Sequence, residues 1–492
     1  MKFKILSLMV ALSAITATTY AQYAGDVLRF SETNYSSNAR FKAMGGAQIG
    51  VGGDLSSLGG NPAGLGLFTK SEFNFSPEFS SLNTRTNYFN EGYKTSKTIP
   101  FVGQMGAAFY LPSYTSNNSK GALSVVFGLG YNRVADYNND FTFGGVNNQS
   151  SFADYFAEIG GSSSPSNLGN NSLEKWAYNN YLISYDNAGY YYPETYVNNT
   201  QLAKELRKGN SSEFNLSAAV NISNEFYIGL GINFLTLDYT RDAEFNEKGM
   251  ARELTTQGVP TGNQKPYNFI FGQNQTTTGE GVNGRLGFIF RPVPEFRIGA
   301  TIQTPTWMEV KDTYTEYLDN RKTAGGTSNT NTYEYNYNIK TPMKSSIGAS
   351  YVIASTALIS ADIDYVDYAS ARISDPYTYE TQLVNENNAN IRNRYQEALN
   401  YRIGAEIKFD NISLRGGYAL NGSPYKDNKD QYTQVYTGGL GVRINNYSID
   451  LAYQHLENNS NFSPYNLVYG TTPSTDVNLK KNNVMLTIGA RF

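Results

Sequence analysis

Apolar and polar residues alternate along most of this chain, and the alternation continues to its last residue. A period of two places successive side chains on opposite faces of a strand. One face is apolar, whereas the other is rich in Gly, Ser and charged residues and is poorly suited to a second buried core. The pattern therefore predicts many strands with one apolar and one polar face. It is clearest over 123–131, 226–234, 401–409, 447–453 and 484–492.

The pattern predicts fourteen strands, an even number of the kind found in bacterial outer-membrane barrels. Their junctions alternate between short and long, as expected for short periplasmic turns and long external loops. The sequence therefore predicts an all-β fold, a 14-stranded antiparallel transmembrane β-barrel. The strands are expected at 71–89, 98–112, 120–144, 212–223, 224–243, 276–291, 295–314, 333–354, 356–370, 394–409, 411–422, 432–445, 446–457 and 478–492, and the long loops at 90–97, 145–211, 244–275, 315–332, 371–393, 423–431 and 458–477.

Residues 1–21 have the features of a cleaved secretory signal peptide. Lys2 and Lys4 precede an apolar stretch that begins at Ile5, and cleavage is expected after Ala21. The stretch is too short for a membrane-spanning helix, which needs about 20 apolar residues. We therefore predict export to the outer membrane of a Gram-negative bacterium.

Composition supports the barrel and argues against an enzyme. Charged residues make up 16% of the chain and aromatic residues 14%, as expected for a lipid-facing surface with interfacial aromatic girdles. The chain has no Cys, and His455 is its only histidine, which argues against metal sites and His-based catalysis. The formal net charge of −3 gives no field for nucleic-acid binding. We expect no enzyme activity, no cofactor and no metal.

Residues 22–70 lack sustained alternation and are rich in glycine. A fourteen-stranded barrel has a lumen too wide for its own side chains to fill. This segment could therefore fill the lumen as a plug, and a loose periplasmic tail is the alternative. Residues 71–492 would form the barrel with its loops.

The loop at 145–211 is long enough to carry its own structure and is expected to be partly helical. It contains aromatic residues at helical spacing, which could capture an apolar ligand. Alternatively, these residues pack the loop onto the barrel rim. They are Phe152, Tyr155, Phe156, Trp176 and Tyr181.

The chain resembles the FadL/TodX family of outer-membrane transporters of long-chain fatty acids and aromatic hydrocarbons. The resemblance covers essentially the whole mature chain and rests on the order and spacing of several short segments. These are Asn61-Pro62-Ala63-Gly64, 294–299, Thr341-Pro342-Met343-Lys344, 414–418 and the C-terminal aromatic residue. The resemblance implies a lumenal hatch that carries the Asn-Pro-Ala motif. It also implies capture of ligand by external loops and sideways release through an opening made by a kink in the third strand.

Several residues have expected roles in such a transporter. Gly128 and Gly130 are permissive sites for the third-strand kink. Asn61 and Pro62 would shape the hatch and gate the pocket, although a simple proline turn explains them equally well. The inward-facing Arg402, Arg415 and Arg443 could neutralise carboxylates of ligand or hatch. Alternatively, they pair across the lumen with carboxylates of the wall, which are Asp362, Asp364, Glu406 and Asp450.

The expected partners are a hydrophobic small molecule, outer-membrane lipid and the barrel-assembly machinery, the last through the strand ending at Phe492. The barrel is expected to be a monomer that binds no nucleic acid. A hydrophilic diffusion porin and a structural or adhesive barrel are the alternative functions. An open lumen would favour the porin, and a dispensable N-terminal segment would favour the structural barrel.

Overall fold

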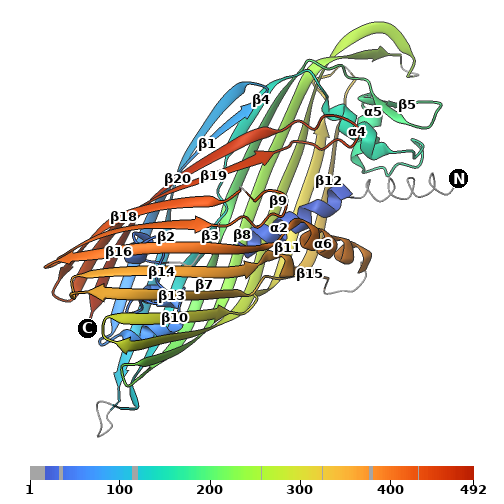
Figure 1. The fold of residues 1–492 in the computed structure, drawn as a ribbon. Helices are drawn as coiled ribbons and strands as arrows, with labels where there is room; N and C mark the ends of the chain where they lie inside the picture. The colour runs from blue at the N-terminus through green and yellow to red at the C-terminus, as the bar shows by residue number, and fades with distance from the viewer. Residues whose placement is uncertain are drawn as a thin grey trace.

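The protein forms the predicted barrel, in which fourteen antiparallel spans close on themselves (Figure 1). The computed structural model describes residues 17–32, 37–113, 120–255, 258–323, 325–375, 381–429 and 431–492, without the side chains of 17–22 and Thr381. Closure is made by β1, which pairs with both β2 and β20. The spans are β1 (Glu72–Tyr88), β2 (Glu91–Pro112), β3 with β4 (Ala122–Asp136, Phe141–Asn147), β7 (Asn199–Ile222), β8 (Phe226–Leu254), β9 (Pro260–Val293), β10 with β11 (Phe296–Gln303, Trp307–Asp319), β12 with β13 (Ser328–Lys340, Lys344–Ile353), β14 with β15 (Ala357–Asp367, Arg372–Ser374), β16 (Glu397–Phe409), β17 (Ile412–Asn421), β18 (Thr433–Ile444), β19 (Tyr447–Phe462) and β20 (Thr475–Arg491).

Four of the spans are interrupted where the expected strands were continuous. The interruptions fall at 137–140, 304–306, 341–343 and 368–371, the last including η3 (Tyr368–Ser370). Pro305 and Pro342 lie in two of them, because proline cannot donate a hydrogen bond to a sheet ladder. Alternation resumes after each break, so the sequence pattern extends across it.

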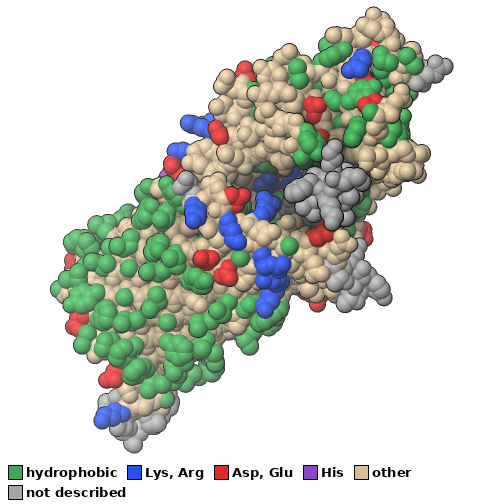
Figure 2. Space-filling view, turned by 45° about the vertical axis from the view of Figure 1, so that its right-hand side comes forward, with side chains coloured by type: hydrophobic (Ala, Val, Ile, Leu, Met, Phe, Trp, Pro, Cys, Tyr) green, Lys and Arg blue, Asp and Glu red, His purple; other side chains and the backbone are tan. Residues whose placement is uncertain are grey.

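An apolar band surrounds the short-turn end of the barrel, where large hydrophobic side chains face outward (Figure 2). On β8 the band extends from Phe226, 48% exposed, to Phe234, 50% exposed. Burial of such a band in lipid is favourable, so this part of the barrel is the membrane-facing region. Among the described residues, no helix is both long and apolar enough to cross a bilayer.

Beyond the band, several strands continue where loops were expected. Most of the expected loop 90–97 is part of β2, and most of the expected loop 244–275 belongs to β8 and β9. Outside the membrane both faces of a strand contact water or the cap. Polar residues can therefore occupy both faces, and the sequence no longer alternates between apolar and polar positions. The strand ladder nevertheless continues, with β8 and β9 paired from Phe226 to Leu254.

The external end of the barrel carries a small cap within the 145–211 segment. The cap contains helices α4 (Phe152–Gly160) and α5 (Leu173–Asn179) and a two-stranded sheet of β5 (Ile183–Tyr185) and β6 (Tyr191–Pro193). β7 then begins at Asn199, well before the expected strand. The helix α6 (Thr381–Arg394) lies in another external connection and contacts α2.

The N-terminal segment lies inside the barrel (Figure 1). It contains α2 (Ala17–Ser31), α3 (Ala39–Lys42), η1 (Leu55–Leu58) and η2 (Pro62–Leu67). The helix α3 contacts β18, β19 and β20, whereas η1 and η2 contact strands from β1 to β9. The expected signal peptide lies mostly outside the described residues, since α2 begins at Ala17, ahead of the expected cleavage position.

Candidate functional site

The Asn-Pro-Ala-Gly motif attaches the N-terminal segment to the barrel wall. Asn61 caps η2, because its Oδ1 accepts a hydrogen bond from the backbone N of Ala63 at 3.1 Å. Its Nδ2 donates to the carbonyl of Ile49 at 2.8 Å and to that of Phe288 on β9 at 3.1 Å. One buried side chain therefore ties the motif, the preceding segment and the wall together.

Glycines on the wall make room for this motif. A Cβ at Gly229 of β8 would lie 2.3 Å from the carbonyl carbon of Pro62, and one at Gly287 of β9 would lie 2.0 Å from Asn61 Oδ1. Within the segment, a Cβ at Gly64 would lie 2.3 Å from Ser57 Oγ. A side chain at any of these three positions would therefore have to displace its neighbour, which at Gly229 is backbone.

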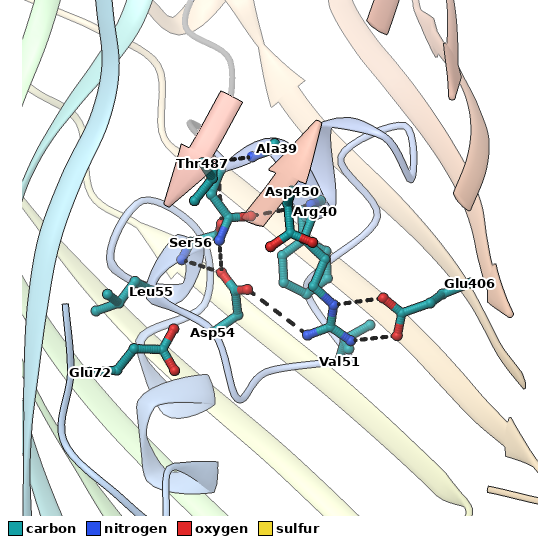
Figure 3. Close-up of polar contacts among 12 residues, drawn as sticks. Ala39, Arg40, Val51, Asp54, Leu55, Ser56, Glu72, Glu406, Asp450 and Thr487 are labelled. Carbon is teal, nitrogen blue, oxygen red and sulfur yellow. Dashed lines mark hydrogen bonds and ion pairs between the residues drawn. The ribbon is translucent and has the colours of Figure 1, made fainter. Parts of the chain in front are cut away.

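A second attachment is ionic and joins α3 to the wall strands β16 and β17 (Figure 3). Arg40 of α3 forms a bidentate pair with Glu406 of β16, with both N–O distances at 3.0 Å. Arg415 of β17 donates to the same carboxylate at 2.6 Å. Asp54 receives hydrogen bonds from Asn38 Nδ2 at 2.7 Å and from the backbone N of Ser56 at 2.8 Å. The segment is thus fixed internally and also to the wall.

The predicted lumenal charges mostly pair with one another. Arg402 donates to Asp364 at 2.7 Å, and Arg415 donates to Asp450 at 2.6 Å. Arginines of the wall were expected to neutralise carboxylates of the hatch. At Glu406 the charges are the other way round, because the arginine, Arg40, belongs to the N-terminal segment and the carboxylate belongs to the wall. Arg443 forms no ion pair among the described residues.

Gly128 and Gly130 lie within the continuous, paired part of β3 rather than at its interruption. A Cβ at Gly128 would lie 2.7 Å from Leu58 Cδ2, and one at Gly130 would lie 2.8 Å from Leu58 Cδ1. These glycines therefore leave space for the N-terminal segment. The third span is interrupted at 137–140, and a register shift between Arg133 and Ala135 precedes the break.

This interruption leaves part of the wall without a strand ladder. β2 pairs with β3 only from Gln104 to Pro112, and β4 pairs with β7 alone. Residues 91–103 of β2 therefore have no strand partner on that side among the described residues. We call the boundary between 91–103 and β3–β4 the β2–β3 seam. Its lower end reaches the apolar band, because Pro100 is paired with the exposed Phe79.

Side chains hold the seam where backbone bonds do not. Lys97 lies 2.9 Å from Asp140, and the guanidinium of Arg133 lies 4.2 Å from the ring centroid of Phe101. Thr86 of β1, the strand on the other side of β2, also reaches β4, because its Oγ1 donates to the carbonyl of Thr142 at 2.6 Å. The run at 137–140 reads Tyr-Asn-Asn-Asp, and its lack of apolar alternation was the signal that could have located the break.

An apolar cluster occupies the lumen behind the seam. It joins α2 residues, including Phe30, to Val134 and Tyr137 at the break and to Leu237 and Tyr239 of β8. The rings of Phe30 and Tyr137 are 5.7 Å apart, and those of Phe30 and Tyr239 are 5.9 Å apart. An apolar surface therefore continues from the lumen to the seam.

The cap aromatics pack against one another and against the external ends of the barrel strands, since the ring centroid of Phe152 lies 5.0 Å from that of Phe245 on β8. Phe152, Phe156 and Trp176 are buried in one cluster, and Tyr155 packs against it. Tyr181 is 39% exposed and faces outward. These buried rings therefore form a packed core at the barrel rim, and their part in ligand capture stays a prediction.

A buried carboxylate anchors the first turn of α4. Glu247 of β8 accepts hydrogen bonds from the backbone N of Phe152 at 2.9 Å, Tyr267 Oη at 2.8 Å, Gln201 Nε2 at 2.7 Å and Ser151 Oγ. It lies far beyond Phe234, outside the membrane band. Burial raises the pKa of its carboxyl, while these hydrogen bonds oppose the rise.

His455 contacts no serine hydroxyl among the described residues. Its Nε2 lies 3.0 Å from Glu457, and its Nδ1 lies 2.7 Å from Asn482 Oδ1. No group of three or more Asp, Glu or His side chains in the described part of the chain could hold a metal ion.

The fold and site define a membrane β-barrel with an occupied lumen and a locally unpaired wall. Its particular architecture is the FadL/TodX-type fold. The chain is similar to the toluene transporter TodX of P. putida, with 14% identity, 93% and 99% coverage of the two chains and a TM-score of 0.52. A FadL homologue of Pseudomonas aeruginosa (10%, 94% and 99%, 0.53) and the CymD monoaromatic hydrocarbon channel (11%, 94% and 99%, 0.51) are also similar. No family model and no curated protein matches the sequence.

Proposed function

We propose that this protein is an outer-membrane transporter of hydrophobic small molecules, such as long-chain fatty acids or aromatic hydrocarbons. The observation that carries the proposal is the combination of an occupied lumen with a seam beside an apolar cluster. The fold it shares with the toluene transporter, the hydrocarbon channel and the FadL homologue supports it. Residues 37–68 act as a hatch, and ligand reaches the lumen through the external loops.

Release occurs sideways through the β2–β3 seam into the bilayer. A hydrophobic chain that passed into the periplasm would expose its methylene groups to water, at about 0.8 kcal/mol for each. Passage along Tyr137 and the seam avoids that exposure. Before release, the side chains of α2, which precedes the hatch in the chain, must give way to the ligand, and this requires α2 to move.

The test is to close the seam. The chain contains no cysteine, so Lys97→Cys with Asp140→Cys can be joined by a short bismaleimide without other reactions. Cross-linking is expected to abolish cellular uptake of radiolabelled oleate and toluene. The matched control is Thr84→Cys with Thr95→Cys, a directly opposed pair on the other edge of β2. Unchanged uptake after seam closure would contradict lateral release.

A second measurement separates the transporter from the alternative functions. A hydrophilic porin is expected to give large, open single channels, whereas a barrel with the hatch in place gives little conductance. A structural or adhesive barrel is expected to tolerate Asn61→Ala and Pro62→Ala without any change in uptake. We also propose a monomer whose last strand, ending at Phe492, is recognised by the barrel-assembly machinery.

A further inference from the structure

A cavity of about 520 Å³ lies at the short-turn end of the lumen, beneath residues 37–68. Its inner side includes Arg40 and Asp54, and its walls come from residues beside the short turns, such as 408–413 and 441–443. Short turns face the periplasm in barrels of this kind. The cavity is therefore a periplasmic one, on the far side of the hatch from the apolar cluster and the seam.

Cations outnumber anions in this cavity. Seven Arg and Lys side chains line it, against five carboxylates. Four of the cations form ion pairs: Arg40, Lys408 and Arg415 with Glu406, and Arg491 with Glu72. The other three form no ion pair among the described residues. They are Arg291, Arg297 and Arg443.

These arginines also have unused hydrogen-bond donors. Arg297 Nη1 donates to the carbonyl of Val51 at 2.5 Å, while its buried Nε has no partner. Arg291 Nε donates to the carbonyl of Pro294 at 3.3 Å. The side chain of Arg443 makes no hydrogen bond in the described part of the chain. Guanidinium groups in this state match the planar, two-oxygen geometry of carboxylate and phosphate.

We propose that this cavity binds a small soluble oxyanion from the periplasm, a phosphate or a short polycarboxylate, through Arg291, Arg297 and Arg443. A soluble anion is favoured over a lipid head group because the barrel wall separates the cavity from the bilayer. Since Arg297 also holds the carbonyl of Val51, the anion would add a link between the wall and the hatch. The site lies apart from the seam and the apolar cluster, and anion binding there can be measured without transport.

The test is isothermal titration of the full-length protein in detergent with inorganic phosphate and with citrate at constant ionic strength. Saturable binding is expected, weakened about tenfold by Arg297→Gln or Arg443→Gln, as for loss of one charge-assisted hydrogen bond. The double variant is expected to lose binding, and Arg443→Lys to retain part of it. The control is Arg321→Gln, an exposed residue at the external end.

Three outcomes would overturn the proposal. One is titration without saturation by either anion, and another is equal binding by wild type and the double variant. The third is binding only to vesicles containing phosphatidylglycerol and not to the soluble anions, which would identify a lipid head group instead. Heat-modifiable migration on gels confirms that each variant is a folded barrel, so loss of binding cannot reflect misfolding.

Discussion

Asn61 Oδ1 lies 2.0 Å from the point that a Cβ atom would occupy on Gly287. The motif of the N-terminal segment and the wall strand β9 are therefore fitted to each other at a single position. Asn61 also bonds the carbonyl of Phe288, the next residue along the strand. A methyl group at 287 would have to displace the amide that makes this bond.

Gly287→Ala is accordingly expected to displace the motif and loosen the hatch. Single-channel conductance in planar bilayers should rise, and cells should become more sensitive to large antibiotics. The matched control is Gly284→Ala on the same strand, where the nearest atoms to a Cβ lie at 3.8 Å. Equal conductance in the two variants would show that the contact does not hold the hatch.

The ionic attachment gives a second expectation. Glu406→Gln leaves Arg40 and Arg415 without their shared carboxylate, and breaking a buried pair is destabilising by about 3–5 kcal/mol. Local release of α3, seen as faster hydrogen exchange over 39–42, should follow while the barrel stays folded. The exposed carboxylate of Glu334 provides the control variant Glu334→Gln. Unchanged exchange in Glu406→Gln would mean that the other contacts of α3 suffice.

The alternation predicted the fold because a membrane barrel repeats one physical constraint on every strand. Lipid requires apolar side chains outside, and the lumen tolerates polar ones inside. The break at 137–140 was missed because alternation resumes after it in β4, so that two strands look like one, although the run Tyr-Asn-Asn-Asp itself lacks alternation. Gly128 and Gly130 would allow a bend, but in the structure their lack of a side chain makes room for Leu58. Leu58 is distant in sequence, so the strand pattern does not indicate this contact.

Similar reasons explain what was missed at the site. Arg40 lies in a segment with no periodicity, and nothing local indicates that it pairs with Glu406. The wall glycines 229 and 287 look like ordinary inward positions until the segment is placed against them. The cap aromatics were identified, but a helical spacing alone does not separate a buried core from a binding surface.

Phe30→Ala tests whether α2 competes with ligand for the apolar cluster. Truncation removes the ring that packs on Tyr137 and Tyr239 and leaves space in the lumen. Binding of a hydrophobic fluorescent probe is expected to tighten several-fold. The control is Phe409→Ala, an outward residue 58% exposed in the membrane band. Weaker binding in Phe30→Ala would indicate that the ring contacts ligand instead of excluding it.

The cap should depend on pH through Glu247. Burial raises the pKa of this carboxyl above its ordinary value of 4.5, so the folded cap binds the proton more tightly than the unfolded cap. The protonated carboxyl therefore stabilises the folded cap. This stabilisation is fully present below pH 4.5 and is lost as the pH rises through the pKa of Glu247 in the folded cap. Proteolysis of the cap is therefore expected to be slower at mildly acidic than at neutral pH.

Glu247→Gln should remove this pH dependence. It should also weaken the cap, because an amide nitrogen would then face the hydroxyls of Ser151 and Tyr267, both of which donate to the carboxylate. Asp238→Asn, an exposed position on the same strand, is the control. A pH dependence that persists in Glu247→Gln would assign it to another group.

The ion pair across the seam is expected to control the rate of transport. The Lys97–Asp140 pair is partly exposed, with side chains 27% and 11% accessible, so it contributes up to about 1 kcal/mol. Lys97→Gln is expected to lower the barrier to seam opening by this amount and to speed oleate uptake about two- to fivefold. Lys94→Gln, on the exposed part of the same strand, should leave the rate unchanged. Slower uptake in Lys97→Gln would mean that the ion pair aids passage of the ligand and does not close the seam. Equal uptake rates in the variant and the wild type would place the rate-limiting step elsewhere, at the hatch or the loops.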